Sequence, residues 1–398
     1  MSTESNARLN QRIVTENVSK DALITSLRER ISRHIRTLGL ADYDPEHIVH
    51  NSEKNRIRAS HAMQRAEFNA KEHRALGAWV NKLLPVFATG GDIVPEKIDP
   101  EIVPVISGES TGYLFRLATL LWSIPVSRGY GRRMRFLVMD RHNQKLIGVL
   151  ALGDPVFNLK VRDDWIEWNA EQRRNRLVSI MDAYVVGAVP PYTKLLGGKL
   201  ITCIIGSREV SEHFDLRYGD TKGIISHQRK NAKLALVTIT SALGRSSMYN
   251  RVKLPGLLEL VKIGITAGWG HFHIPNDIFD DMKKLLLIEK HPYVLGYKYG
   301  DGPNWRMRLI REALEIIGLD GDLLRHGIAR EVYTMPLANN WKSYLQGQEE
   351  YCDIDRPTLS EIASACLQRW IIPRSERNQE YRAWSTDDAK ALFAPITN

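Results

Sequence analysis

A pair of glycines at a predicted strand-to-helix turn is the first feature that could do chemistry. The stretch AVPPYTKLLGGKLITCI, residues 188–204, has an apolar run before the glycines and a helical apolar pattern after them. Backbone amides at a helix start bind anions, and glycine lets a phosphate approach them closely, so Gly197 and Gly198 are candidate phosphate-binding residues. A tight turn that binds nothing needs the same glycines, and the P-loop spacing is missing.

A second candidate group lies in VRDDWIEW, residues 161–168, where charged side chains stand between two tryptophans. Arg162, Asp163 and Glu167 could hold a metal ion or act as acid and base, because like charges in a partly buried site separate their pKa values. The alternative is a structural ion pair between Arg162 and Asp163. Both interpretations remain open from the sequence.

Two histidines in GWGHFHIP form a weak candidate for metal binding. His271 and His273 are two residues apart, so both rings would point the same way from a strand. A zinc site needs three or four ligands, and Glu259 and Asp277 are not at a diagnostic spacing. We therefore expect no metal site.

Two polar stretches have the composition of nucleic-acid-binding loops. The stretch ALGRSSMYNR follows a predicted buried strand, where functional loops of mixed sheets lie, and supplies Arg245 and Arg251. The stretch GDGPNWRMRLIR combines an aromatic ring with arginines, a mixture that stacks on bases and binds phosphate. Its candidate residues are Asn304, Trp305, Arg306 and Arg308. A serine that caps a helix, or a loop that only connects elements, would explain the same residues.

The elements that must position these residues follow from hydrophobic periodicity. Apolar residues at helical spacing, with arginines opposite, predict a basic helical N-terminal region over 1–109. From residue 110 the pattern predicts helices and strands in a mixed α/β core over 110–345, including a hairpin through the turn RHNQ. A helical C-terminal extension is expected over 346–398.

Three local expectations refine the core. The stretch KLITCIIGSREVSEHF has the pattern of one helix, and SSMYNRVK that of a short helix. Asn276 is the expected N-cap of the helix that begins NDIFDDMKKLLL.

Composition limits the class of protein. The chain has 398 residues, with 55 Lys and Arg against 46 Asp and Glu, and its net charge of +9 favours a polyanionic partner such as nucleic acid. No run of about 18 apolar residues predicts a membrane span, and the first residues lack a signal-peptide core. The three cysteines are too scattered for a disulfide framework. We expect a cytoplasmic protein with reduced cysteines.

Several stretches together resemble the DruA family of the Druantia anti-phage defence system. They are LIGVLALGDPVFNLKVRDDWIEW, YVVGAVPPYTKLLGGKLI, TSALGRSSMYNRVK, GWGHFHIP, GDGPNWRMRLIR and DLLRHGIAREVY, in this order over roughly residues 110–345. The resemblance implies a cytosolic bacterial protein that works in defence against phage. It also implies partner proteins encoded beside it, including a large helicase-like protein, but no known reaction.

The order of elements is also similar to that of GNAT acyltransferases, which implies a GNAT-like core and acyl-CoA as a cofactor. In that likeness Lys194 stands for the arginine of the pyrophosphate-binding turn, and Gly197 and Gly198 lie in the turn itself. Lys199 stands where a second small residue belongs, so its side chain would project into the space of the pyrophosphate. Tyr249 stands where such enzymes often keep a tyrosine acid.

Three hypotheses of function follow. The leading one is a defence component that binds DNA, RNA or partner proteins through a GNAT-like core rather than converting a small molecule. The second is an acyl-CoA-dependent acyltransferase, with Tyr249 as general acid. The third is a metal-dependent nuclease whose site combines Arg162, Asp163 and Glu167 with His271 or His273.

Overall fold

The computed structural model describes residues 20–37, 51–127, 129, 131–222, 229–266, 268–271, 274–295, 303–324 and 328–393. The chain divides into two compact units. Unit 1 comprises residues 1–61 and 267–329, and unit 2 comprises residues 62–266 and 330–398. The boundaries expected at 109/110 and 345/346 both fall inside unit 2 and do not coincide with this division. Among the described residues, no helix is long and apolar enough to cross a membrane.

Unit 1 is helical in its described part. Its helices are α2 (Lys20–Thr37), α3 (Asn51–Ser60), α10 (Asn276–Ile288), α11 (Pro292–Leu295) and α12 (Pro303–Ile316). The predicted stripe of α2 is confirmed, because Leu27 and Ile31 are buried in one cluster with residues of α10 and α12. The expected N-cap was wrong. Asn276 is the first residue of α10, after Pro275, and its side chain instead accepts a hydrogen bond from Arg306 at 3.1 Å.

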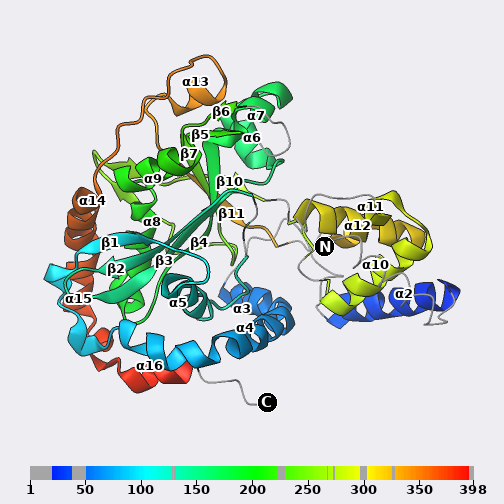
Figure 1. Ribbon diagram of the computed structural model, residues 1–398, viewed down its shortest axis with the longest axis horizontal. Coiled ribbons are helices and arrows are strands. Elements are labelled where there is room, and N and C mark those ends of the chain that lie inside the picture. Colours follow the sequence, from blue (N-terminus) through cyan, green and yellow to red (C-terminus); the bar gives the residue numbers. More distant parts are fainter. Residues whose placement is uncertain are drawn as a thin grey trace. The chain divides into compact units, whose positions relative to one another are not determined.

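Unit 2 contains a seven-stranded mixed sheet, which confirms the predicted mixed α/β fold (Figure 1). The strand order is β1-β2-β3-β4-β7-β11-β10. The bounds are β1 (Pro100–Pro104), β2 (Arg133–Asp140), β3 (Lys145–Gly153), β4 (Ile180–Ala188), β7 (Leu236–Thr240), β11 (Glu331–Pro336) and β10 (Val261–Ile265). Two small sheets pair β5 (Asp220–Lys222) with β6 (Arg229–Asn231), and β8 (Lys253–Leu254) with β9 (Leu258–Glu259). The predicted hairpin is present as β2 and β3, which pair antiparallel.

One pair of neighbouring strands in the large sheet is parallel. Strands β4 and β7 pair only from Ile180 with Leu236 to Asp182 with Thr238, whereas the other neighbours run antiparallel. Beyond Asp182, β4 continues to Ala188 without β7 as a ladder partner. The sheet therefore opens between these two strands on the side where β4 ends.

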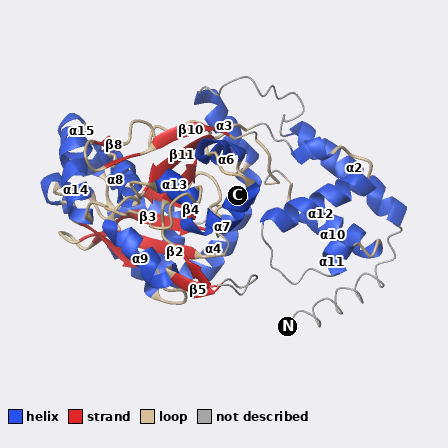
Figure 2. Cartoon of the chain, turned by 90° about the horizontal axis from the view of Figure 1, so that it is seen from above, coloured by secondary structure: helices blue, strands red, loops and turns tan. Residues whose placement is uncertain are grey.

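Helices cover both faces of the sheet, as Figure 2 shows. Their bounds in unit 2 are α4 (Ala62–Leu83), α5 (Ser110–Thr119), α6 (Lys160–Ile166), α7 (Ala170–Arg176), α8 (Gly197–Ile204), α9 (Arg208–Tyr218), α13 (Trp341–Leu345), α14 (Leu359–Cys366), α15 (Ile372–Arg377) and α16 (Thr386–Leu392). Helices α4 and α5 share one apolar cluster with the sheet, and α8, α9 and α14 share another. Strand β3 contributes Val149 to the first and Leu150 to the second, because successive strand residues face opposite sides.

Two local predictions were wrong. The expected single helix after the glycines is two helices, because Ser207 accepts a hydrogen bond from the Val210 amide and so starts α9 anew. The stretch SSMYNRVK forms turns rather than a helix, and Arg251 ends them with a φ of 58°, outside the helical region.

The close approach of β3 and β4 gives a test of the sheet. A Cβ atom on Gly148 would lie 2.3 Å from the Gly187 carbonyl oxygen, which is backbone and cannot rotate away. We expect Gly148→Ala to lower the free energy of unfolding by about 1–3 kcal/mol, measured by urea denaturation. In the matched control Gly77→Ala, nothing lies within 4 Å of the new Cβ, so the change should be neutral or stabilising. Equal effects of the two changes would contradict the packing described for β3.

Candidate functional site

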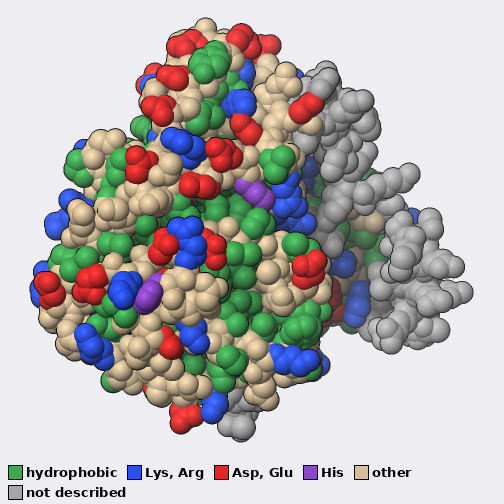
Figure 3. Space-filling model, turned by 60° about the vertical axis from the view of Figure 1, so that its left-hand side comes forward, with side chains coloured by type: hydrophobic (Ala, Val, Ile, Leu, Met, Phe, Trp, Pro, Cys, Tyr) green, Lys and Arg blue, Asp and Glu red, His purple; other side chains and the backbone are tan. Residues whose placement is uncertain are grey.

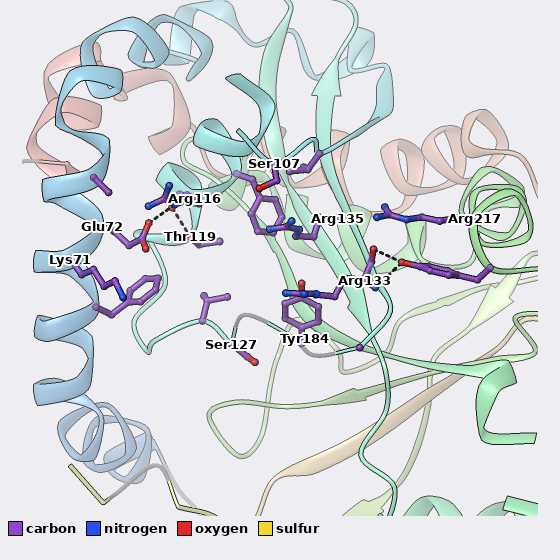
Figure 4. Close-up of a pocket in the computed structure, with 17 residues that line it drawn as sticks. Lys71, Glu72, Ser107, Arg116, Thr119, Ser127, Arg133, Arg135, Tyr184 and Arg217 are labelled. Carbon is purple, nitrogen blue, oxygen red and sulfur yellow. Dashed lines mark hydrogen bonds and ion pairs between the residues drawn. The ribbon is translucent and has the colours of Figure 1, made fainter. Parts of the chain in front are cut away.

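A basic cavity in unit 2 is the candidate functional site (Figure 4). Its volume is about 580 Å³, and its walls come from α4, α5, β2, β4 and α9 and from the loops beside them. Five of its lining side chains are cations and one is a carboxylate: Lys71, Arg116, Arg133, Arg135, Arg217 and Glu72. Aromatic rings line it too, from Phe68, Phe115, Tyr184 and Tyr218.

The arginines of β2 reach the cavity through strand alternation. Arg133 and Arg135 are two residues apart, so they emerge from the same face of the sheet, while Met134 and Phe136 are buried against the opposite helices. The guanidinium of Arg135 lies 5.8 Å from the ring centre of Phe115 on α5. An apolar strand thus carries two cations on one side without disturbing the core.

The end of α9 is fixed to the start of β2 by one hydroxyl group. The Tyr218 hydroxyl donates to the Arg133 carbonyl and accepts from the Arg133 amide, both at 2.9 Å. This double hydrogen bond sets the position of the first strand residue and leaves its side chain to the cavity. It also places Arg217, the preceding residue of α9, on the cavity wall.

The wall opposite β2 is built from α4 and α5. The Glu72 carboxylate is buried and accepts a hydrogen bond from Nε of Arg116 at 2.6 Å. The pair joins α4 to α5 across the cavity wall, and the neighbouring Lys71 also lines the space. Arg116 therefore already has a carboxylate partner in the cavity wall.

A tyrosine hydroxyl in the wall has no partner within the described part of the chain. The hydroxyl of Tyr184 on β4 is buried and makes no hydrogen bond there. Burial raises its pKa, although Arg135 and Arg133 oppose the shift, so the group stays a neutral donor near pH 7. Gly129 and Gly153 pack against its ring, where an added Cβ would lie 2.8 Å and 3.1 Å from ring atoms. The two glycines therefore make room for this ring.

The Arg162 and Asp163 candidates form a structural network. Arg162 is fully buried, and its guanidinium donates to Asp163 and to the carbonyl oxygens of Val156 and Phe157. Asp163 also accepts from Trp168 and Arg173. Among the described residues, no three His, Cys, Asp or Glu side chains gather as metal ligands. This arrangement favours the ion-pair interpretation over the nuclease hypothesis.

A buried carboxyl group lies beside this network. Asp182 of β4 accepts a weak hydrogen bond from the Val156 amide at 3.3 Å, and its Oδ1 atom is buried without a partner among the described residues. Burial raises its pKa to about 7, with Arg162 opposing the shift and Asp154 adding to it. Asp182 therefore loses a proton in the folded protein near neutral pH.

The space beside the glycine turn is occupied by side chains. A Cβ on Gly198 would lie 2.7 Å from the sulfur of Met248. The Lys199 ammonium donates to three carbonyl oxygens of residues 247–250, and burial lowers its pKa. Lys194 forms an ion pair with Glu380 at 3.1 Å, from the C-terminal segment that packs on the turn. These residues do not fit a bound acyl-CoA pyrophosphate.

The remaining candidates of unit 2 lie in or next to the turns after β7. Tyr249 is buried, its pKa is raised by burial, and its ring lies 5.6 Å from that of Tyr333. Arg245 and Arg251 are exposed. The tyrosine therefore belongs to the core, and the two arginines lie at the surface of these turns.

The other predicted nucleic-acid residues belong to unit 1. Arg306 lies 4.0 Å from the ring centre of Phe279 and donates to the carbonyl of Ile274, so it holds α12 to α10. Trp305 packs edge-on against the same ring. Arg308 is exposed on α12. The side chain of Asn304 lies outside the described residues, as does His273. The structure does not bring these residues together with Arg245 and Arg251 in one unit.

The basic cavity was not among the sites predicted from the sequence. A signal existed in RRMRFLVMD, where arginines alternate with core residues on a predicted strand. Lys71 and Glu72 gave none, because charged residues on a helix are common on solvated faces. Only the fold brings the segments around residues 71, 116, 133 and 217 to one place.

Comparison with known proteins identifies similar sequences. A sequence model of the family described as "Druantia protein DruA" matches residues 51–347 of this chain. The chain is similar to the Druantia protein DruA of Escherichia coli (strain UMEA 4076-1), with 46% identity over 374 residues, 94% of this chain and 92% of the relative. No solved structure matches. The GNAT likeness therefore stays a prediction.

Asp182 gives a prediction for the pH dependence of stability. Between about pH 4 and pH 7 the unfolded chain releases this proton while the folded chain retains it, so folding becomes less favourable as the pH rises. We expect wild type to lose up to about 1.4 kcal/mol per pH unit relative to Asp182→Asn over this range. Urea denaturation across the range measures the difference. The exposed Asp164→Asn serves as control, and identical slopes for wild type and Asp182→Asn would refute the assignment.

The filled glycine turn predicts that acetyl-CoA does not bind. Met248 and Lys199 occupy the space that a pyrophosphate would need. Isothermal calorimetry with acetyl-CoA at about millimolar concentration should therefore give only the heat of dilution. Saturable heat that disappears in Gly198→Val would instead support the acyltransferase hypothesis.

Proposed function

Because the chain belongs to the DruA family of Druantia proteins, we propose that it serves anti-phage defence by binding nucleic acid in its basic cavity. The observation that carries this proposal is the convergence of five cations from α4, α5, β2 and α9 on one hollow with a single carboxylate. Phosphate groups are the ligands that such a charge distribution attracts most strongly, and arginine binds them through two parallel hydrogen bonds.

The charge of the cavity differs from that of other parts of the surface. On the face shown in Figure 3, Lys and Arg side chains are interspersed with Asp and Glu. Several surface cations have carboxylate partners, such as Arg141 with Asp99 at 2.7 Å. Within the described part of the chain, no carboxylate pairs with Arg135 or Arg217. The cavity is thus a local concentration of positive charge, which favours a polyanion over a neutral ligand.

Binding explains the observed chemistry better than catalysis does. Both candidate catalytic regions have their polar groups engaged in structural contacts, as Arg162 in its network and Lys199 on the carbonyls of the turns show. Tyr249 is buried in the core. We therefore propose a binding protein, with the other Druantia components, including the helicase-like protein, as its protein partners. DNA and RNA both carry the phosphates that the cavity would bind.

The arginines of β2 provide the test of nucleic-acid binding. We expect Arg133→Gln/Arg135→Gln to weaken binding of DNA or RNA about 10-fold to 100-fold, because each change removes a phosphate contact. The slope of log affinity against log salt should become smaller by about two. Fluorescence anisotropy over a salt series measures both quantities.

A matched control removes two charges elsewhere. Arg141→Gln/Lys160→Gln changes two exposed cations that already have carboxylate partners outside the cavity. It should leave affinity nearly unchanged. If wild type binds neither DNA nor RNA at low salt, or if both double variants weaken binding equally, the proposed role of the cavity is wrong.

A further inference from the structure

The shape of the basic cavity limits which part of a nucleic acid can enter it. A volume of about 580 Å³ lies within the range of small-molecule sites, roughly 300–1,000 Å³. The walls rise from α4 on one side and from β2 and α9 on the other (Figure 4). A duplex meets a protein through grooves and phosphates spread over its surface, whereas an unpaired nucleotide can leave the stack and enter a hollow.

The β2 wall has the chemistry of a phosphate site. Arg133 and Arg135 leave the strand on one face about 6–7 Å apart, a spacing that lets both reach one phosphate. The Tyr184 hydroxyl lies in the same wall, buried and without a hydrogen-bond partner among the described residues. A phosphate oxygen that reached this hydroxyl would accept a hydrogen bond from it and satisfy a group that is otherwise costly to bury.

The α4 wall differs from the β2 wall. Phe68 and Ala75 present apolar surface there, and aromatic rings stack on bases without regard to sequence. The Glu72 carboxylate repels phosphate and accepts hydrogen bonds only. A nucleotide would therefore lie with its phosphate toward β2 and its base toward α4.

We propose that the basic cavity holds one unpaired nucleotide that carries a phosphate, supplied by a single-stranded end of DNA or RNA. That the nucleotide belongs to a DNA or RNA strand rests on the proposed function. That the ligand is a nucleotide with a phosphate is argued from the residues of the cavity itself. A terminal phosphate monoester carries more charge than an internal diester, so several converging cations favour an end. A free nucleotide has the same chemistry, and the experiment must separate the two sources.

The test compares oligonucleotides that differ only at their ends. Fluorescence anisotropy is measured with a blunt duplex, with the same duplex carrying a single-stranded overhang, and with that overhang phosphorylated at its 5′ or its 3′ end. We expect the phosphorylated overhang to bind at least about tenfold more tightly than the blunt duplex. Calorimetry with deoxynucleoside monophosphates forms the second arm.

Two variants probe the two walls of the cavity. Tyr184→Phe removes the hydroxyl without removing charge, so it should reduce affinity for the phosphorylated overhang about tenfold while the salt slope stays unchanged. Tyr351→Phe, whose side chain is 75% exposed and does not line the cavity, is the control for the same atom change. Glu72→Gln removes the carboxylate that repels phosphate and leaves Arg116 without its partner, so phosphates of any DNA should bind more tightly and the preference for the overhang over the blunt duplex should fall.

The outcomes together distinguish failure of this inference from failure of the proposed function. Equal binding of blunt and phosphorylated overhang DNA would overturn the inference and leave nucleic-acid binding in place. If monophosphates bind and none of the oligonucleotides does, the cavity binds free nucleotides. That result would overturn both the single-stranded end as the source of the nucleotide and the proposed function. No binding in either arm at low salt would overturn both proposals. An unchanged affinity of Tyr184→Phe would overturn the placement of the phosphate.

Discussion

The short parallel contact between β4 and β7 is the constraint on which the rest of unit 2 depends. The two strands pair only as far as Asp182 with Thr238, and β4 then runs on to Ala188 without that neighbour. Where two strands separate in this way, their buried backbone N–H and C=O groups need hydrogen-bond partners other than each other. Here Lys199 bonds to the carbonyls of residues 247–250, and Met248 packs beside Gly198. Side chains of α8 and of the turns after β7 thus contact one another beyond the end of β4 and stabilise the fold there.

The basic cavity proposed as a binding site lies beside α4 and α5, on the face of the sheet opposite α8. The strands β2 and β4 are apolar enough to support Arg135 and Tyr184 on the α4 and α5 side without loss of packing. Each cation of the basic cavity is attached to a rigid helix or strand, and the hydrogen bonds of Tyr218 to the Arg133 backbone connect two of these elements. Rigid attachment lowers the entropy that ordering long side chains would cost on binding.

The sequence predicted the elements better than it predicted the site. The hairpin of β2 and β3 and the helix α2 followed from local periodicity, because alternation and helical spacing are properties of adjacent residues. The break between α8 and α9 was not predicted, because Ser207 caps α9 only when its own backbone is extended, and the sequence does not specify that conformation. The site was not predicted because the residues of its walls are far apart along the chain. Lys71 and Arg217 line the same cavity only once the chain has folded. Residues such as Arg162 and Trp305, by contrast, attracted attention by their type, although packing and hydrogen bonds occupy them.

Assembling the basic cavity has a consequence for the unoccupied protein. Folding brings like charges from four elements into one space, and among the described residues that line it Glu72 is the one carboxylate. Mutual repulsion among these cations opposes the compact state, most strongly at low ionic strength. An anion that occupies the cavity removes this repulsion and binds the folded chain alone, so occupancy and conformational stability are linked quantities. An anion bound in the cavity would therefore raise the free energy of unfolding, and the lifetime of the protein in the cell would follow the supply of that anion.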